Sequence, residues 1–132
     1  METSLSCFLY HSLLAVNASP NCVADIIKVS RTFNAAKDIT GLLMFDGLRF
    51  CQYMEGPRDR LQDLMQRIAV DPRHEQFTLA LEAQRIHARL FERWSMAYVT
   101  VDDAEPLEVL RLLDGPSALE HLRTLLPTLD MV

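Results

Sequence analysis

Two apolar runs separated by Asp46-Gly47 restrict the fold of this chain more than any other feature of its sequence. Residues 39–45 and 48–54 have the pattern of β-strands, and Asp-Gly between two such runs is the strongest short-range signal for a β-hairpin. The sequence therefore predicts a hairpin over residues 39–54.

Amphipathic helices are expected on both sides of this hairpin. Asn17-Ala-Ser-Pro20 offers a helix cap with proline in the first turn, and apolar residues then recur near a period of 3.6 as far as about Phe33. After the hairpin, Gly56-Pro57 opens a second helix and Asp71-Pro72 ends it.

Three more strands are expected at residues 5–10, 77–83 and 94–101. The order is then β-α-β-β-α-β-β, which predicts an α+β fold resembling a ferredoxin-like sandwich: a five-stranded mixed sheet with two helices on one face. Leucine-rich residues 107–126 predict two short helices, broken at Asp114-Gly115-Pro116, that cover the other face. Such helices can pack on the sheet, on a partner, or on both.

Composition and charge exclude several classes of protein. A chain of 132 residues with 49% hydrophobic residues fits one domain, and a net charge of -5 gives no basic footprint for nucleic acid or for an anionic membrane. The N-terminus lacks a secretory signal and no run is long enough to span a membrane, so we expect a cytoplasmic protein. The three cysteines lack CxxC spacing and predict neither a disulfide framework nor a zinc site.

Sequence signatures of common enzymes are also absent. The chain has no GxGxxG, GxxxxGK[ST], GxSxG or HExxH, and its four histidines are scattered without the spacing of metal ligands. Cys51 has no histidine positioned in the sequence to activate it as a nucleophile. We therefore expect neither a metal site nor an enzyme.

Polar residues on buried elements are the remaining unusual feature. Strand alternation places Gln52 on the same face as Phe50 and Met54, and Tyr10 ends the first predicted strand. The first and third strands of a ferredoxin-like sheet are neighbours, so Tyr10 and Gln52 can meet on the face that receives the two helices. A buried amide needs another polar side chain, backbone or a ligand, and each residue alone is more often an ordinary core residue.

Five blocks of the sequence, taken together, resemble the signature of BLUF domains, the blue-light sensors that use FAD. The resemblance spans about residues 4–101 and implies a flavin-binding photosensor domain at residues 1–101, with residues 102–132 as a C-terminal helical cap of the same domain. The blocks lie at residues 8–12, 33–43, 50–57, 71–74 and 91–96.

The resemblance implies four photoactive residues. Tyr10 matches the tyrosine that donates an electron and a proton to the excited flavin, and Gln52 matches the glutamine between that phenol and the flavin ring. Trp94 and Met96 match the pair on the last strand that responds to the glutamine. A glutamine amide suits this role, because rotation or tautomerisation reverses which group donates and which accepts.

The resemblance also implies three further residues that bind the cofactor, which it gives as FAD in preference to FMN. Asn34 matches the asparagine at the N3–H/C4=O edge of the ring, Arg73 the arginine at the C2=O side, and His74 the residue that packs on a ring face. Taken singly, Asn34 can be a helix C-cap, and Arg73 and His74 can be a solvated turn. Phe33 stands where related domains often carry a polar residue.

A short chain of this kind is expected to be a stand-alone receptor that signals through contacts: a homo-oligomer with a separate downstream signalling protein. The alternatives are a light-insensitive ferredoxin-like interaction module and a small acyl- or phosphoryl-transfer enzyme. A yellow protein favours the sensor, whereas a colourless one that takes up no flavin favours the module.

Overall fold

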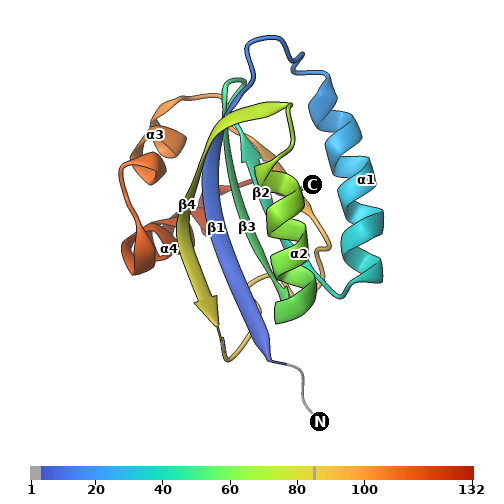
Figure 1. The fold of residues 1–132 in the computed structure, drawn as a ribbon. Coiled ribbons are helices and arrows are strands. Elements are labelled where there is room, and N and C mark those ends of the chain that lie inside the picture. Colours follow the sequence, from blue (N-terminus) through green and yellow to red (C-terminus); the bar gives the residue numbers. More distant parts are fainter. Residues whose placement is uncertain (1–3, 85) are drawn as a thin grey trace.

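The computed structural model of the protein describes residues 4–84 and 86–132, so residues 1–3 and 85 of the expected domain at 1–101 lie outside the described residues. Within the described residues, five strands form one sheet in the order β4-β1-β3-β2-β5. Helices α1 and α2 pack on one face of the sheet, and α3 and α4 lie on the other (Figure 1). The predicted α+β fold with a mixed five-stranded sheet is confirmed. The elements in chain order are β1 (Leu5–Leu14), α1 (Cys22–Ala36), β2 (Thr40–Phe45), β3 (Arg49–Pro57), α2 (Arg58–Ala69), β4 (His74–Gln84), β5 (Ala97–Thr100), α3 (Glu105–Arg111), α4 (Gly115–Leu125) and a short 3-10 turn (Leu126–Thr128).

The hairpin predicted from Asp46-Gly47 is present. Strands β2 and β3 are antiparallel, and Gly47 has φ +96°, a conformation that favours glycine. The Asp46 carboxylate closes the turn, since its Oδ1 accepts hydrogen bonds from the amides of Leu48 (3.0 Å) and Arg49 (2.7 Å). The turn residue types thus determine where the two strands start to pair.

The central strand β1 is longer than expected and pairs with both β3 and β4. The prediction that Tyr10 ends this strand was wrong, because β1 runs on to Leu14 and Tyr10 lies in its middle. The expected neighbourhood is confirmed, since Tyr10 lies directly opposite Gln52 in the antiparallel β1–β3 register. Strand β4 is also longer than predicted and begins at His74.

Alternation along the strands divides the core between the two faces of the sheet. One set, which includes Phe8, Tyr10 and Met54, packs under α1 and α2. The other set includes Leu9, Leu107 and Leu122 and packs under α3 and α4. The leucine-rich helices therefore pack on the sheet, with Leu110 and Leu122 almost fully buried there.

Three further predicted boundaries differ from the structure: the start of α1, the end of α1 and the start of β5. The cap at Asn17 with Pro20 in the first turn was wrong: residues 15–18 and 19–22 form turns, and α1 begins at Cys22 without a side-chain cap. The helix also continues past Phe33, so Asn34 is helical and is not a C-cap. The last strand begins at Ala97, so Trp94 and Met96 precede β5 and do not lie on it.

Within the described residues, no helix is both long enough and apolar enough to cross a membrane.

Candidate functional site

A cleft of about 580 Å³ lies between α1 and α2, and the sheet forms its floor. Its size lies within the range of sites for small molecules and cofactors. Both helices and four strands contribute to it, with the turn before β4 and His74 at the start of β4 closing one end. The residues that line it are Tyr10, Ile26, Val29, Ser30, Phe33, Asn34, Leu43, Phe50, Gln52, Leu64, Arg67, Ile68, Val70, Asp71, Pro72, Arg73, His74 and Met96.

Tyr10 and Gln52 form a buried hydrogen-bonded pair on the floor of this cleft. The Tyr10 hydroxyl donates to Oε1 of Gln52 at 2.5 Å, and both side chains are buried. Burial raises the pKa of the Tyr10 phenol above its ordinary value, and the nearby Cys51 and Asp71 act in the same direction. The phenol is therefore held in its neutral form, ready to donate.

The other end of the Gln52 amide has weaker partners. Its Nε2 donates to the sulfur atoms of Met54 at 3.2 Å and Met96 at 3.6 Å. A thioether sulfur is a weak acceptor, so the NH₂ group has hydrogen-bonding capacity left for a stronger acceptor in the cleft. Gln52 is thus positioned between a phenol, two methionines and the space in which a ligand can bind.

Asn34 carries an unpaired acceptor at the same site. Its Nδ2 donates to the backbone oxygen of Ser95 at 2.8 Å, while its buried Oδ1 has no partner among the described residues. A buried polar atom without a partner costs free energy, so an atom of this kind in a binding cleft points to a ligand that donates. The N3–H group of a flavin ring is such a donor.

Arg73 and His74 lie at the end of the cleft, where Arg73 ends the turn before β4 and His74 is the first residue of that strand. The guanidinium of Arg73 is 2.6 Å from the Asp71 carboxylate, and the hydrogen bond between them is the main reason that the pKa of Asp71 lies below its usual value. The ring nitrogens of His74 lie 2.7 Å from Ser12 Oγ and 2.6 Å from the backbone oxygen of Ile68. Both residues are thus held in place by neighbours of their own.

Six of the seven residues proposed from the sequence line this cleft: Tyr10, Asn34, Gln52, Arg73, His74 and Met96. Trp94 does not line it, and its side chain is 37% exposed. Its backbone oxygen accepts from the amide of Gly41 on β2 at 3.0 Å. The expectation that Trp94 and Met96 lie on the last strand was wrong, because both precede β5.

Arg67 is a cleft residue that sequence reasoning missed. Its guanidinium carbon lies 4.8 Å from the centre of the Phe33 ring, a cation–π distance, and both side chains line the cleft. A basic residue on the last turn of a helix is ordinary in a sequence, since it also suits the helix dipole. Only its position across from α1 distinguishes it.

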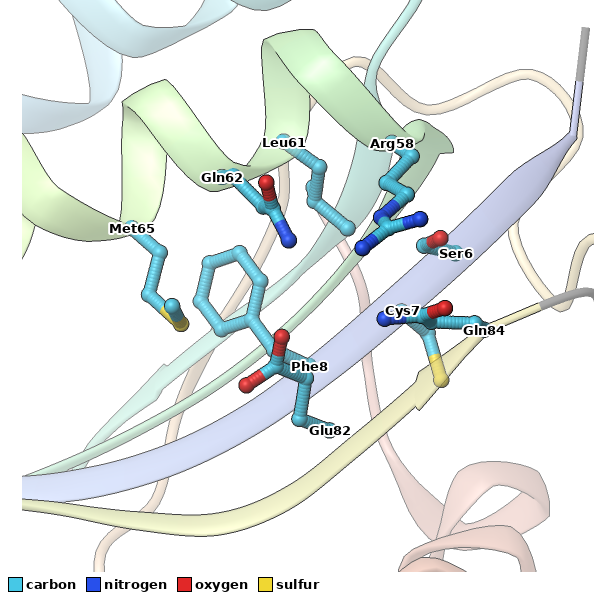
Figure 2. Close-up of a pocket in the computed structure, with 9 residues that line it drawn as sticks. All are labelled: Ser6, Cys7, Phe8, Arg58, Leu61, Gln62, Met65, Glu82 and Gln84. Atoms are coloured by element: carbon cyan, nitrogen blue, oxygen red, sulfur yellow. The ribbon is translucent and has the colours of Figure 1, made fainter.

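A second hollow lies under the first turns of α2, where Leu61 and Met65 face Phe8 of β1 (Figure 2). Its volume of about 10 Å³ is at the lower limit for one water molecule. This hollow is therefore a packing gap, and the α1–α2 cleft is the candidate cofactor site.

These features of the α1–α2 cleft fit a flavin. The cleft is wide enough for a ring system, and its apolar residues, such as Ile26, Leu64 and Ile68, suit the faces of an aromatic ring. The amides of Asn34 and Gln52 provide hydrogen-bonding groups for the polar edge of such a ring.

Comparisons with known proteins agree with this assignment. The sequence pattern of BLUF, described as sensors of blue-light using FAD, matches residues 5–97. The BLUF protein BlrB in its dark state has a similar structure, with a TM-score of 0.79 and 32% identity over 92% of this chain and 94% of BlrB. The chain belongs to the BLUF family of flavin-binding blue-light sensors.

Other relatives are longer proteins. The blue light- and temperature-regulated antirepressor BluF of Escherichia coli (strain K12) is 29% identical over 70 residues, which are 53% of this chain and 17% of that protein. BlrP1 of Klebsiella pneumoniae, solved with FMN and cyclic diGMP, has a TM-score of 0.68 and 28% identity, over 90% of this chain and 30% of that chain. This chain spans less than a third of either relative.

Proposed function

We propose that this protein senses blue light through a flavin held in the α1–α2 cleft, and that Tyr10 and Gln52 are the residues that respond first. The observation that carries the proposal is the hydrogen bond from the Tyr10 hydroxyl to Oε1 of Gln52, at 2.5 Å on the floor of the cleft. A flavin supplies absorption of blue light and reversible one-electron chemistry when it is bound.

In the proposed response, Tyr10 would give one electron and its hydroxyl proton to a flavin excited by blue light and would then recover both. No net oxidation or reduction remains. While the proton is away, the phenol oxygen can only accept, so the Gln52 amide turns or tautomerises until its donor end faces Tyr10. The lasting change is a rearranged set of hydrogen bonds around Gln52.

Three further residues have proposed roles in binding the cofactor. Asn34 accepts from the ring's N3–H group through its unpaired Oδ1, Arg73 donates at the C2=O side, and His74 packs against a ring face. FAD is the proposed form of the flavin, and FMN is the alternative. Mass spectrometry of the flavin released from denatured protein decides between them.

Met96 and Trp94 are proposed to carry the change away from the cleft. Met96 Sδ is a partner of Gln52 Nε2, so a turned amide alters the contact between them. Trp94 is two residues away on the same segment and responds through the backbone. The signal then reaches residues 102–132, the proposed output segment of the same domain.

Output is proposed to depend on protein contacts without catalysis by this chain, as a homo-oligomer that meets a separate downstream protein. Escherichia coli BluF, a blue light- and temperature-regulated antirepressor, is an example of a relative compatible with output of this kind. Leu110 and Leu122 are not available for such contacts, since both side chains are buried against the sheet. Light scattering in the dark and under blue light measures the oligomeric state.

The deciding experiment is an absorption spectrum of flavin-loaded protein before and after blue light. The expected result is a flavin band that shifts to the red and returns in the dark, without a lasting adduct or reduced flavin. A protein that takes up no flavin after reconstitution overturns the proposal and favours the light-insensitive interaction module. A flavin-loaded protein without the shift overturns the roles of Tyr10 and Gln52.

A further inference from the structure

The exposed guanidinium of Arg31 on α1 joins two segments that are distant in the sequence. Its Nε donates to the backbone oxygen of Met96 at 3.0 Å, and its Nη2 donates to the backbone oxygen of Val132 at 2.7 Å. Met96 is also a partner of the Gln52 amide. One side chain therefore links the floor of the cleft to the last residues of the sequence.

Val132 in turn occupies the outer edge of β5. The amide of Tyr98 donates to the oxygen of Val132, and the amide of Val132 donates to the oxygen of Tyr98, both at 3.0 Å. On its other side β5 pairs with β2. The oxygen of Val132 thus accepts from both the amide of Tyr98 and the guanidinium of Arg31. Arg31 therefore helps to hold this oxygen where it pairs with Tyr98.

The preceding residues cross from one face of the sheet to the other. Leu129 and Met131 pack against the core under α3 and α4. Val132 instead reaches Arg31 of α1, the helix on the opposite face (Figure 1). Residues 129–132 therefore lie across the edge of β5 and contact both layers of the protein.

The segment before β5 is held by α1 at two consecutive carbonyl groups. Asn34 donates to the oxygen of Ser95 and Arg31 to the oxygen of Met96. A displacement of Met96 changes the position of its carbonyl, and the planar fork of the guanidinium cannot keep both acceptors when one of them moves. The bond to Val132 is then weakened together with the bond to Met96.

We propose that Arg31 is a positioning residue that couples Met96 to the pairing of Val132 with β5, so that light loosens residues 129–132 from the edge of that strand. The inference rests on the proposed function, because it needs a response at Gln52 that moves Met96. The part of the inference that concerns the dark state does not rest on the proposed function, because removing the guanidinium loosens Val132 without any light.

The test is amide hydrogen exchange at Tyr98 and Val132 in flavin-loaded protein, for wild type, Arg31→Gln and the matched control Lys28→Gln. Both variants remove one cation from the exposed side of α1, but the Lys28 ammonium makes no hydrogen bond or ion pair in the described part of the chain. In the dark, Arg31→Gln is expected to raise exchange of these two amides about tenfold, which corresponds to about 1.4 kcal/mol. Lys28→Gln is expected to leave them unchanged.

In the light, wild type is expected to show faster exchange at the same two amides, and Arg31→Gln no further rise. Arg31→Gln is expected to keep the red shift of the flavin. Arg31→Lys keeps the charge without the fork, so it is expected to behave like Arg31→Gln, and wild-type exchange in that variant overturns the inference.

Failure of the inference and failure of the proposed function are distinguishable. A red shift in wild type with unchanged exchange at Tyr98 and Val132 overturns the coupling and leaves the photochemistry intact. Loss of the red shift in Arg31→Gln places Arg31 in the flavin response itself and also overturns the coupling. A wild-type protein with no red shift overturns the proposed function, while the dark comparison of Arg31→Gln with Lys28→Gln still tests the link to Val132.

Discussion

At the scale of single residues, the two ends of the Gln52 amide have different surroundings. Its oxygen accepts from Tyr10, whereas its NH₂ group donates to two methionine sulfurs. Turning the amide exchanges a strong acceptor for a donor on the Tyr10 side and presents the oxygen to the methionines. The methionine sulfurs accept only weakly from the NH₂ group and have no proton to donate to the amide oxygen, so the Tyr10 side and the ligand determine which arrangement is favoured.

Removing either member of this pair is expected to abolish the red shift while the protein still folds and binds flavin. Gln52→Leu leaves the buried Tyr10 hydroxyl unpaired, and Tyr10→Phe leaves Oε1 of Gln52 unpaired, so each is expected to cost about 1 to 3 kcal/mol of stability. Absorption spectra and urea denaturation measure the two effects.

The matched control for these substitutions is Tyr98→Phe, which removes a phenol hydroxyl with no hydrogen bond among the described residues. This variant is expected to keep the red shift and nearly all of the stability. A normal shift in flavin-loaded Gln52→Leu refutes the assigned role of the amide.

The hydrogen-bonded pair of Asp71 and Arg73 is expected to make the stability of the protein depend on pH. The pKa of Asp71 is lowered chiefly by the hydrogen bond from Arg73, so the pair is intact above the ordinary pKa of aspartate, about 3.9. The contribution of the pair is lost as the pH falls through the lowered pKa of Asp71. Since both groups are partly exposed, the loss is expected to be about 0.2 to 1 kcal/mol.

Urea denaturation between pH 6 and pH 3, roughly the range in which carboxylates titrate, checks this expectation. Wild type is expected to lose stability more steeply with acid than Asp71→Asn, because the variant has no carboxylate to protonate at this position. Parallel curves for the two proteins contradict the assignment of the shift to Asp71.

At the scale of elements, the connection from β4 to β5 is held by a buried carboxylate. Glu55 is fully buried on β3, and its two oxygens accept from the amides of Leu90 at 2.8 Å and Phe91 at 2.7 Å. They also accept from the hydroxyls of Tyr53 at 3.1 Å and Thr40 at 3.0 Å. The hydrogen bonds to this one carboxylate therefore hold residues 90 and 91 in place, where a neighbouring strand would otherwise provide a ladder of backbone hydrogen bonds.

Truncating this residue is expected to be strongly destabilising. Glu55→Ala leaves two backbone amides and two hydroxyls without their acceptor, at an expected cost of about 2 to 5 kcal/mol. Glu120→Ala, on the exposed side of α4, is the control and is expected to stay within about 0.5 kcal/mol of wild type. Equal midpoints in urea denaturation contradict the role given to Glu55.

The contrast between β3 and this connection shows what the sequence can predict. The Tyr10–Gln52 contact follows from strand alternation and topology, both of which leave a regular pattern. The place of Trp94 and Met96 does not, because residues 90–96 are fixed by Glu55, Gly41, Asn34 and Arg31, which lie far away in the chain. A period of two over residues 94–101 resembles a strand, but only Ala97–Thr100 pair with β2 in the register of a strand.

At the scale of the whole molecule, two hydrophobic cores share one sheet. Each strand contributes alternate residues to the core under α1 and α2 and to the core under α3 and α4. The C-terminal helices are therefore expected to unfold together with the sheet. The proposed output segment is then part of the cooperative unit and is not an independent tail.

Leu122 and Leu112 provide a matched test of this view. Leu122 lies on the buried face of α4 and is 1% exposed, whereas Leu112, just after α3, is 86% exposed. Leu122→Ala is expected to lower the stability of the whole domain by about 2 to 5 kcal/mol, and Leu112→Ala by less than about 0.5 kcal/mol. A single urea transition, followed by signals from both faces of the sheet, checks the cooperativity. Separate transitions contradict it.

The parallel pairing of β5 with β2 has a consequence for the kinetics of folding. Leu42 pairs with Ala97, 55 positions later in the sequence, whereas β2 and β3 meet through a turn of three residues between them. Closing the longer loop costs more chain entropy, and β5 has only four residues with which to compensate. The hairpin is therefore expected to form early in the nascent chain, and β5 to join the sheet late. The other four strands can therefore form their sheet before β5, the strand beside Met96, has joined it.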